Sequence, residues 1–426
     1  MIRKNNHSSN RRQHLSLRSL AFAVLLIFNL QFSIFNLLSC SPEPPLHLYD
    51  AQEVVLDQPV IDLDLEVYWD YMLDFGFDVK YDWREKWYYG WDDEDRELFG
   101  ELGYAIPKSF VICRYYTGDV PDAKHTGVIR NEVEGTHFQD RYDWGFWDIL
   151  VWNRIETLDG VQSLIFDDVY THLDSVTAHT NQSMIPSRYQ APRYTHSFYQ
   201  PEPLFAAYDE NIEINRNLDG FTYDPERHVY FRQLEMILRP ITYIYLTQVI
   251  LHNNNGRITA VDGSSNLSAM ARTTCLNSGR AGDDAITVNY GVRMKRNIPM
   301  VPYSETAGVN GTTETEGTAT NAEIVDIIGG RLMTFGIPGH RANAISRAGE
   351  VHDEHRHYID LNMQFNNGID SLFVFDVTDQ VRSQYKGGVI TVELDMDTVP
   401  IPTRKGGSGF NAVVVEPDSV THVIEM

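Results

Sequence analysis

The segment Tyr81–Glu97 gathers residue types that could recognise and process a sugar. It sets Trp83, Trp87 and Trp91 beside the acidic run Asp92-Asp93-Glu94-Asp95. Indole rings stack on the apolar face of a sugar, and a pair of carboxylates carries out acid–base chemistry in glycoside hydrolysis. No second, separately placed carboxylate can be identified, however. We therefore expect a surface loop whose tryptophans pack on a β-sandwich, with acids that could at most hold Ca²⁺ weakly.

A histidine-rich stretch, "EVHDEHRHYID", could supply metal ligands. His352, His355 and His357 lie close to Asp353 and Glu354. If a strand begins by His355, then His355 and His357 share one face, and two ligands could meet one ion. The stretch lacks the HExxH order, and a solvated entry to a strand explains it equally well. The sequence therefore predicts no resident metal, with His355 and His357 as the weak candidates, and no other cofactor.

Other catalytic signatures are absent from the sequence. It contains no G-x-S-x-G motif, no P-loop and no G-x-G-x-x-G dinucleotide fingerprint. This favours a protein that is not an enzyme.

The first forty residues have the layout of a bacterial lipoprotein signal. Five basic residues precede a nearly all-apolar stretch, Leu20–Leu38, which ends in Leu37-Leu38-Ser39-Cys40. A small residue before a cysteine is what the signal peptidase needs after the thiol is acylated. A plain signal peptide or a spanning helix is the alternative, but no positively charged stop-transfer flank follows. We predict cleavage between Ser39 and Cys40 and a lipid such as palmitate on Cys40, which ties the protein to the membrane.

The charge balance narrows the possible partners. The formal net charge is −24, and loss of a leader with five basic and no acidic residues would take it to −29. Such an acidic chain is a poor candidate for binding nucleic acid or anionic head groups. It suits a soluble body held off a membrane by its anchor.

Two cysteines remain beyond Cys40, namely Cys113 and Cys275, and they form no CxxC pair. They could form a disulfide in an oxidising compartment. Isolated cysteine is commonly a small core residue, so two buried free thiols are the favoured prediction.

Alternation of apolar and polar residues predicts strands along most of the chain. In "VIDLDLEVYW", Ile61, Leu63 and Leu65 would face one way and the carboxylates the other, as in a half-buried antiparallel strand. Further strands are predicted at Lys108–Tyr116, Trp147–Asn153, Val161–Asp168, Arg239–Leu251 and Arg257–Gly263. Ser265–Thr274 is the best candidate for a short helix or turn, and Val301–Ala322 is predicted to be a mobile loop.

The strands fall into two blocks separated by a stretch without a dominant period, between about Ser187 and Pro225. Short strands separated by turns in two blocks predict an all-β protein with two antiparallel β-sandwich domains in tandem. We place the signal peptide at 1–39, the N-terminal domain at 40–215 and the C-terminal domain at 216–426.

Several strand patterns, taken together with the lipobox cysteine, resemble a known family. These are "IDLDLEVYWD", "WGFWDILVWN", "RPITYIYLTQVIL", "RLMTFG", "FVFDVTDQV" and "GGVITVEL". In this order they resemble the fimbrillin-like surface lipoproteins, and among these the fimbrillin-A-associated anchor proteins and their lipoprotein relatives. The resemblance implies two transthyretin-like sandwiches, lipid anchoring in the outer membrane at the cell surface, and fimbrial subunits as partners. It brings no catalytic residues.

Two functions follow as alternatives. The first is a fimbrial anchor, or a minor fimbrial or adhesin component. The second is a surface glycan-binding or glycan-processing lipoprotein, in which Trp83, Trp87 and Trp91 would carry recognition.

The resemblance also implies a test of anchor against shaft subunit. A shaft subunit of this pilus type is cut after a basic residue near its lipidated end, which removes its first strand and opens a groove for a neighbour's strand. Here Ser41–Val79 contains no Arg or Lys and ten carboxylates, and the first basic residues are Lys80 and Arg84. We therefore expect the first strand to stay tied to Cys40, although an acidic linker that only keeps the body solvated would look the same.

Overall fold

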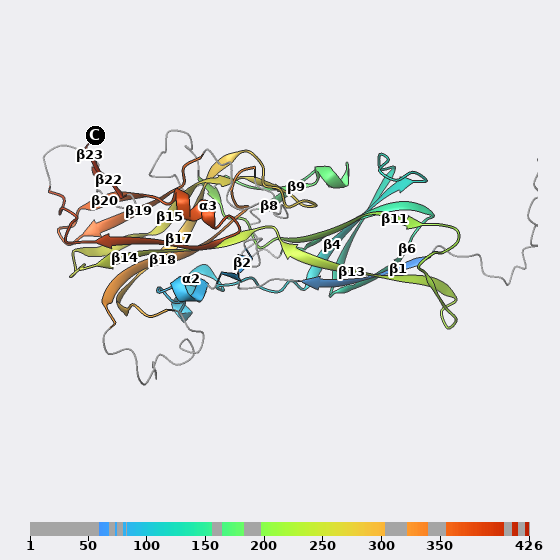
Figure 1. The fold of residues 1–426 in the computed structure, drawn as a ribbon, viewed down its shortest axis with the longest axis horizontal. Coiled ribbons are helices and arrows are strands. Elements are labelled where there is room, and N and C mark those ends of the chain that lie inside the picture. The colour runs from blue at the N-terminus through green and yellow to red at the C-terminus, as the bar shows by residue number, and fades with distance from the viewer. Residues whose placement is uncertain are drawn as a thin grey trace, which may run out of the picture. The chain divides into compact units, whose positions relative to one another are not determined.

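The computed structural model describes residues 59–67, 73–74, 80–81, 83–155, 164–182, 197–302, 322–339, 355–403, 411–415 and 422–425 (Figure 1). Strands dominate these residues and the helices are short, so the protein is all-β as predicted. No helix in this part of the chain is long and apolar enough to cross a membrane. The predicted signal peptide, the cleavage site at Ser39 and Cys40, and most of the predicted loop Val301–Ala322 lie outside the described residues.

The first sheet is an eight-stranded sheet in the order β5-β4-β7-β11-β13-β1-β6, with β12 paired to β13. Its strands are β1 (Val60–Val67), β4 (Ser109–Gly118), β5 (Gly127–Glu134), β6 (His137–Arg141), β7 (Gly145–Asn153), β11 (Phe205–Ile214), β12 (Thr222–Asp224) and β13 (Val229–Pro240). The strands β5 and β6 lie at opposite ends of this order, yet only Gly135 and Thr136 join them. The sheet must therefore curl back on itself.

Both faces of the centre of the first sheet are buried. The inner face carries Ile61, Leu63, Phe110, Ile149 and other residues of one core cluster. The outer face is covered by a small sheet in the order β16-β9-β8, made of β8 (Leu164–Asp167), β9 (Thr177–Thr180) and β16 (Thr273–Cys275), and by the 3-10 turn η3 (Leu173–Ser175). This explains why β4 and β7 are apolar on both sides.

The second sheet has ten strands in the described chain, in the order β21-β14-β18-β17-β15-β19-β20-β22-β23, with β10 paired to β17. Its strands are β10 (Ser197–Tyr199), β14 (Tyr243–His252), β15 (Ile258–Ala271), β17 (Ala285–Pro299), β18 (Ile324–Thr334), β19 (Tyr358–Phe365), β20 (Asp370–Asp376), β21 (Gly388–Asp395), β22 (Asn411–Val415) and β23 (His422–Glu425). A large apolar cluster forms its core. The cluster includes Val381 of the helix α3 (Thr378–Ser383) and the flanking residues Val377 and Tyr385.

The remaining elements lie early in the chain. A two-stranded pair joins β2 (Leu73–Asp74) to β3 (Lys80–Tyr81), and the 3-10 turn η1 (Trp83–Lys86) and the helix α2 (Asp93–Phe99) follow. The acidic run thus starts a helix and is not the surface loop that the sequence predicted. Asp92 is the N-cap of α2, and the other three acidic residues form its first turn.

The predicted helix or turn at Ser265–Thr274 is wrong, since most of it belongs to β15. The pairing of β15 with β17 shifts register between Leu267 and Met270, and Ala269 has φ +64°. A β-bulge of this kind inserts extra residues, so that apolar residues three apart both face the core. Leu267 and Met270 are both fully buried there, and their spacing imitates a helical period.

The sheets are mixed and not purely antiparallel, which corrects the predicted pairing. The strand β1 runs parallel to β13 and antiparallel to β6, and β14 runs parallel to β21. The chain leaves the first sheet for the last time between Pro240 and Tyr243, although β10, earlier in the chain, already pairs with β17 of the second sheet. The predicted boundary at 215/216 falls after β11, between strands of the first sheet. The turns around β12 explain the irregular composition there. The division into two transthyretin-like domains stays a prediction.

Both cysteines beyond Cys40 are free, as predicted. Cys113 is buried, and burial raises the pKa of its thiol to about 11. Cys275 is only half-buried on β16, so the prediction of full burial holds for Cys113 alone.

Candidate functional site

The tryptophan-rich segment forms a strap, defined here as residues 83–104, on the outer face of the second sheet. Its aromatic side chains make one cluster with apolar residues of β14, β18 and β21; the buried members are Trp83, Trp87, Tyr89, Trp91, Leu246, Ile250, Val325, Ile327 and Val389. Rings of successive odd-numbered residues touch, with centroids 5.5 Å apart for Trp87 and Tyr89. Odd-numbered residues of the extended stretch thus point toward the sheet.

Burial removes the tryptophans from any glycan-binding role in this structure. Trp83, Trp87 and Trp91 are 5%, 0% and 3% exposed. Sugar recognition needs an indole face open to solvent, and these faces lie on the sheet. The packing of the tryptophans on a sheet is as predicted, and the alternative assignment of these three residues to glycan recognition is wrong.

The side chain of Gln248, in β14, holds the strap through hydrogen bonds to the strap's backbone. Its side-chain Oε1 accepts hydrogen bonds from the backbone N–H groups of Tyr88 and Tyr89, at 2.9 and 3.3 Å. Its Nε2 donates to the carbonyl of Lys86 at 2.7 Å and to Oγ1 of Thr391 at 2.9 Å. One buried amide thus satisfies three backbone groups of an irregular segment, which would otherwise lose their hydrogen bonds with water.

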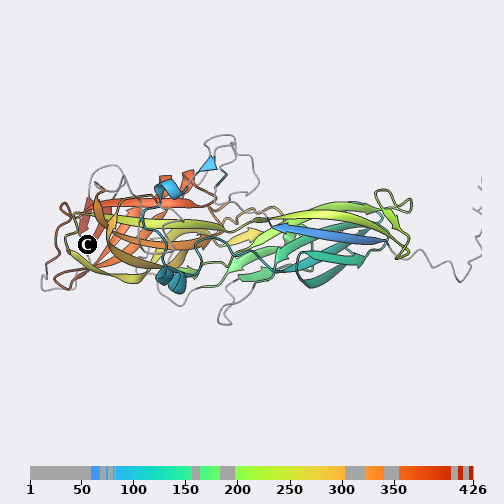
Figure 2. The ribbon, with the colours of Figure 1, turned by 90° about the horizontal axis from the view of Figure 1, so that it is seen from below.

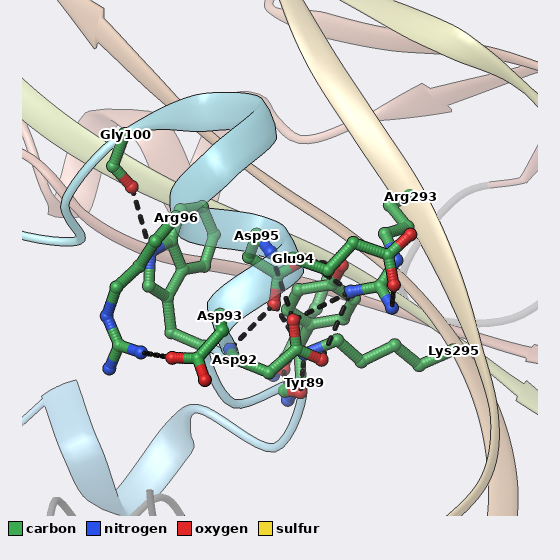
Figure 3. Close-up of polar contacts among 11 residues, drawn as sticks. Tyr89, Asp92, Asp93, Glu94, Asp95, Arg96, Gly100, Arg293 and Lys295 are labelled. Atoms are coloured by element: carbon green, nitrogen blue, oxygen red, sulfur yellow. Dashed lines mark hydrogen bonds and ion pairs between the residues drawn. The ribbon is translucent and has the colours of Figure 1, made fainter. Parts of the chain in front are cut away.

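The acidic run completes the strap with a charge network (Figure 3). Asp92 and Asp95 form a capping box at the start of α2: the side chain of each accepts from the backbone N–H of the other. The box aims both carboxylates toward β17, where Arg293 and Lys295 lie two residues apart on one face. Arg293 Nη1 lies 2.9 Å from Asp92 Oδ1 and 2.9 Å from Asp95 Oδ1, and Glu94 also pairs with Arg293.

Lys295 and Tyr89 also contact the two carboxylates of the capping box. Lys295 Nζ lies 3.0 Å from Asp92 Oδ2 and 2.5 Å from Asp95 Oδ2, and 4.1 Å from the centroid of the Tyr89 ring. The Tyr89 hydroxyl donates to Asp95 Oδ1 at 2.8 Å. Asp95 is fully buried, and Arg293 and Lys295 supply the opposite charges that offset its removal from water.

The network shifts the ionisation of its members. Burial alone would raise the pKa of Asp92, but the backbone N–H of Asp95 together with Lys295 and Arg293 holds that pKa well below its ordinary value. Burial raises the pKa of Tyr89, and the neighbouring Asp95 raises it further. These shifts keep Asp92 ionised and Tyr89 neutral. The pair Asp92 and Asp95 therefore serves as counter-charge to two cations and is not spaced around an open site.

The histidine candidates do not form a metal centre. The strand β19 begins at Tyr358, so His355 and His357 precede it and do not share a strand face. His357 is fully buried, and its Nδ1 lies 3.2 Å from the carbonyl oxygen of Ser268. Within the described ranges, no group of three or more His, Cys, Asp or Glu residues could hold a metal ion.

The position of β1 is the second candidate site. It lies between β13 and β6, with eight residues in register with β13 and five with β6, and Figure 2 shows it among the strands of the first sheet. Ile61 and Leu63 are fully buried and Leu65 is 3% exposed, while Asp64 and Glu66 are exposed, as the alternation predicted. The strand is thus an integral part of the core.

Sequence reasoning did not identify Gln248, Arg293 or Lys295. The signal for the last two was present: "VRMK" places two cations at alternate positions of a strand, which is unusual in so acidic a chain. Gln248 lies in an apolar strand, "YIYLTQVIL", where a lone amide needs a partner.

No family model and no curated protein matches the sequence. Among solved structures, the chain is similar to a candidate adhesin from Bacteroides ovatus, with 10% identity, a TM-score of 0.42, and coverage of 80% of this chain and 94% of that one. It is also similar to the fimbrial anchor protein Mfa2 from Porphyromonas gingivalis, with 9% identity, a TM-score of 0.33, and coverage of 86% and 95%. The tip fimbrial protein Mfa3 from the same organism has 8% identity, a TM-score of 0.26, and coverage of 75% and 93%. Similarities this distant do not assign a function.

Proposed function

We propose that this protein is an outer-membrane surface lipoprotein that serves as a fimbrial anchor or as a minor fimbrial or adhesin component, without a catalytic role. The observation that carries the proposal is the place of β1. Among the strands that the structure describes, the one nearest in sequence to the expected lipid on Cys40 is an interior strand of the first sheet, held by β13 on one side and β6 on the other.

An anchor must keep its lipid joined to its folded body. Removal of β1 would strip Ile61, Leu63 and Leu65 from the core, and burial of each such side chain contributes about 1.5–3 kcal/mol. Between Cys40 and the end of β1 there is no Arg or Lys, so a protease that cuts after basic residues has no site there. Both features favour an anchor over a subunit that is released into a shaft.

The strap attaches the chain to the folded body at a second point, after β1 in the sequence. After β1 the chain crosses to the second sheet, where the strap is held, and then returns to the first sheet at β4. Tyr104 donates to the carbonyl of Thr242 at 2.5 Å, and Arg331 Nε donates to the carbonyl of Leu102 at 2.8 Å. Tension on a lipid at Cys40 would meet β1 first and the strap next. Such a series of attachments suits a protein that holds a filament on a membrane.

Mass spectrometry of the protein from cells tests the proposal. We expect a mature form that begins at an acylated Cys40 and co-purifies with fimbrial subunits after cross-linking. The variant Cys40→Ala should lose partition into detergent, while Cys275→Ser should partition like the wild type. A lipid-free form that begins at or beyond Tyr81, found in shed fimbriae, would contradict the anchor. Partition of Cys40→Ala like the wild type would contradict the lipid site.

A further inference from the structure

The strand β21 stands at one end of the second sheet, and its edge is covered in an unusual way. Among the described strands, β14 is its only strand partner, paired in parallel from Tyr245 and Gly388 to His252 and Asp395. Alternate residues of a strand direct their N–H and C=O groups to the same side. The backbone N–H and C=O groups of Val389 and Thr391 point away from β14, because they bond to side chains of the α3 region. On an uncovered edge strand such groups are open to pairing with another chain.

Two glutamine side chains occupy these positions. Gln384 Oε1 accepts from the N–H of Val389 at 2.8 Å, and its Nε2 donates to the carbonyl of Val389 at 3.0 Å. Gln380 repeats the arrangement on Thr391, with both hydrogen bonds at 2.8 Å. Each primary amide offers one acceptor and one donor in the same plane, as a peptide group of a neighbouring strand does.

The spacing of the two glutamines matches the strand. Residues four apart on a helix lie about 5–6 Å apart on one face. Alternate residues of a strand lie about 6.6 Å apart. Gln380 in α3 and Gln384 directly after α3 can therefore meet Val389 and Thr391 together. Val381, between them, is fully buried in the core and fixes the helix against the sheet.

The turn before β21 leaves room for this contact. A Cβ at Gly388 would lie 1.9 Å from Gln384 Oε1. At Gly387, φ is +93° and a Cβ would lie 2.2 Å from the carbonyl oxygen of Ile244, so only glycine fits without strain. The sequence "GGVITVEL" thus brings the strand close enough for the amides to reach its edge.

We propose that α3 is an edge cap, and that its two glutamine amides keep β21 from pairing with β21 of a second copy of this chain. The segment Val389-Ile390-Thr391-Val392 is uncharged and entirely β-branched, the composition that pairs most readily at an exposed edge. A twofold axis would bring two such edges together in antiparallel register, because the same surface is then used by both copies.

The test replaces the amides and keeps their volume. In Gln380→Met/Gln384→Met the side chains stay unbranched but offer no donor comparable to an amide and only a weak sulfur acceptor. At concentrations low enough to keep the double variant monomeric, we expect amide hydrogen exchange at Val389 and Thr391 to rise about tenfold or more, since each loses its partner, while the exchange of Ile390, on the β14 side, stays as in the wild type. At higher concentrations sedimentation velocity should show a dimer, in which pairing of β21 protects the two amides again.

Ser383→Ala is the matched control, because it removes an exposed hydroxyl of the same helix and keeps both amides. It should stay monomeric with wild-type exchange. Unchanged exchange in the double variant would overturn the cap, and raised exchange in a protein that stays monomeric would overturn its role against self-pairing. If the double variant does not fold, Gln380→Met alone is measured at Thr391 under the same criteria.

Discussion

The charge network predicts that Asp95 holds the strap on the second sheet, whereas its helical neighbour Asp93 does not. We compare Asp95→Ala with Asp93→Ala, two residues apart on α2. Asp95 is fully buried and accepts from Tyr89, Arg293, Lys295 and the backbone of Asp92. The side chain of Asp93 is 98% exposed and pairs only with Arg96 among the contacts resolved for it.

The expected magnitudes differ several-fold. Removal of one partner from a buried charge pair costs about 3–5 kcal/mol. Asp92 and Glu94 remain to balance Arg293 and Lys295, so we expect about 3 kcal/mol for Asp95→Ala. An exposed pair on a helix contributes about 0.3–0.5 kcal/mol, which is the loss expected for Asp93→Ala.

Two measurements separate local from global effects. Urea unfolding followed by tryptophan fluorescence reports on the whole protein, because Trp147 and Trp152 of the first sheet emit together with Trp83, Trp87 and Trp91 of the strap. Limited trypsin digestion reports on opening of the strap, which contains Lys86 and Arg96. We expect Asp95→Ala to be cut there much faster than Asp93→Ala. Equal stability and equal cleavage of the two variants would refute the claim that the network holds the strap.

Three further outcomes follow from the structure. Folding lowers the pKa of Asp92 from about 3.8, so the contribution of its carboxylate to stability is fully present above pH 4 and is lost as the pH falls through the lowered folded value. Tryptophan fluorescence should show the strap loosening in acid, and Asp92→Asn should remove that part of the transition. Gly329→Ala should destabilise by about 1–3 kcal/mol, because a Cβ there would lie 2.4 Å from the Tyr89 ring, whereas an alanine at the open Gly263 gives no such clash; equal unfolding midpoints would contradict this. Leu63→Ala should cost about 2–5 kcal/mol and leave β1 exchanging faster, while Asp64→Ala on the exposed face should be near neutral in urea unfolding.

Local chemistry was enough to predict several features from the sequence alone. The alternation of Ile61, Leu63 and Leu65 predicted both the strand β1 and its buried face, because side-chain direction along a strand depends only on the backbone. The tryptophans of the strap were expected to pack on a sheet because such large apolar rings are rarely left exposed. The same local reasoning failed at β15, where a bulge gives Leu267 and Met270 a helical spacing.

Tertiary structure decided which elements meet. The strand β1 pairs with β13, about 170 residues later, and the acidic run of α2 meets Arg293 and Lys295, about 200 residues later. Nothing in either segment specifies its partner, since many apolar strands and several cations could satisfy the same local pattern. Only the curl of the first sheet and the return of the chain to the second bring these groups within contact distance. The buried amides of Gln248, Gln380 and Gln384 show the same limit, because a glutamine reveals its role only when the backbone groups it satisfies are in place.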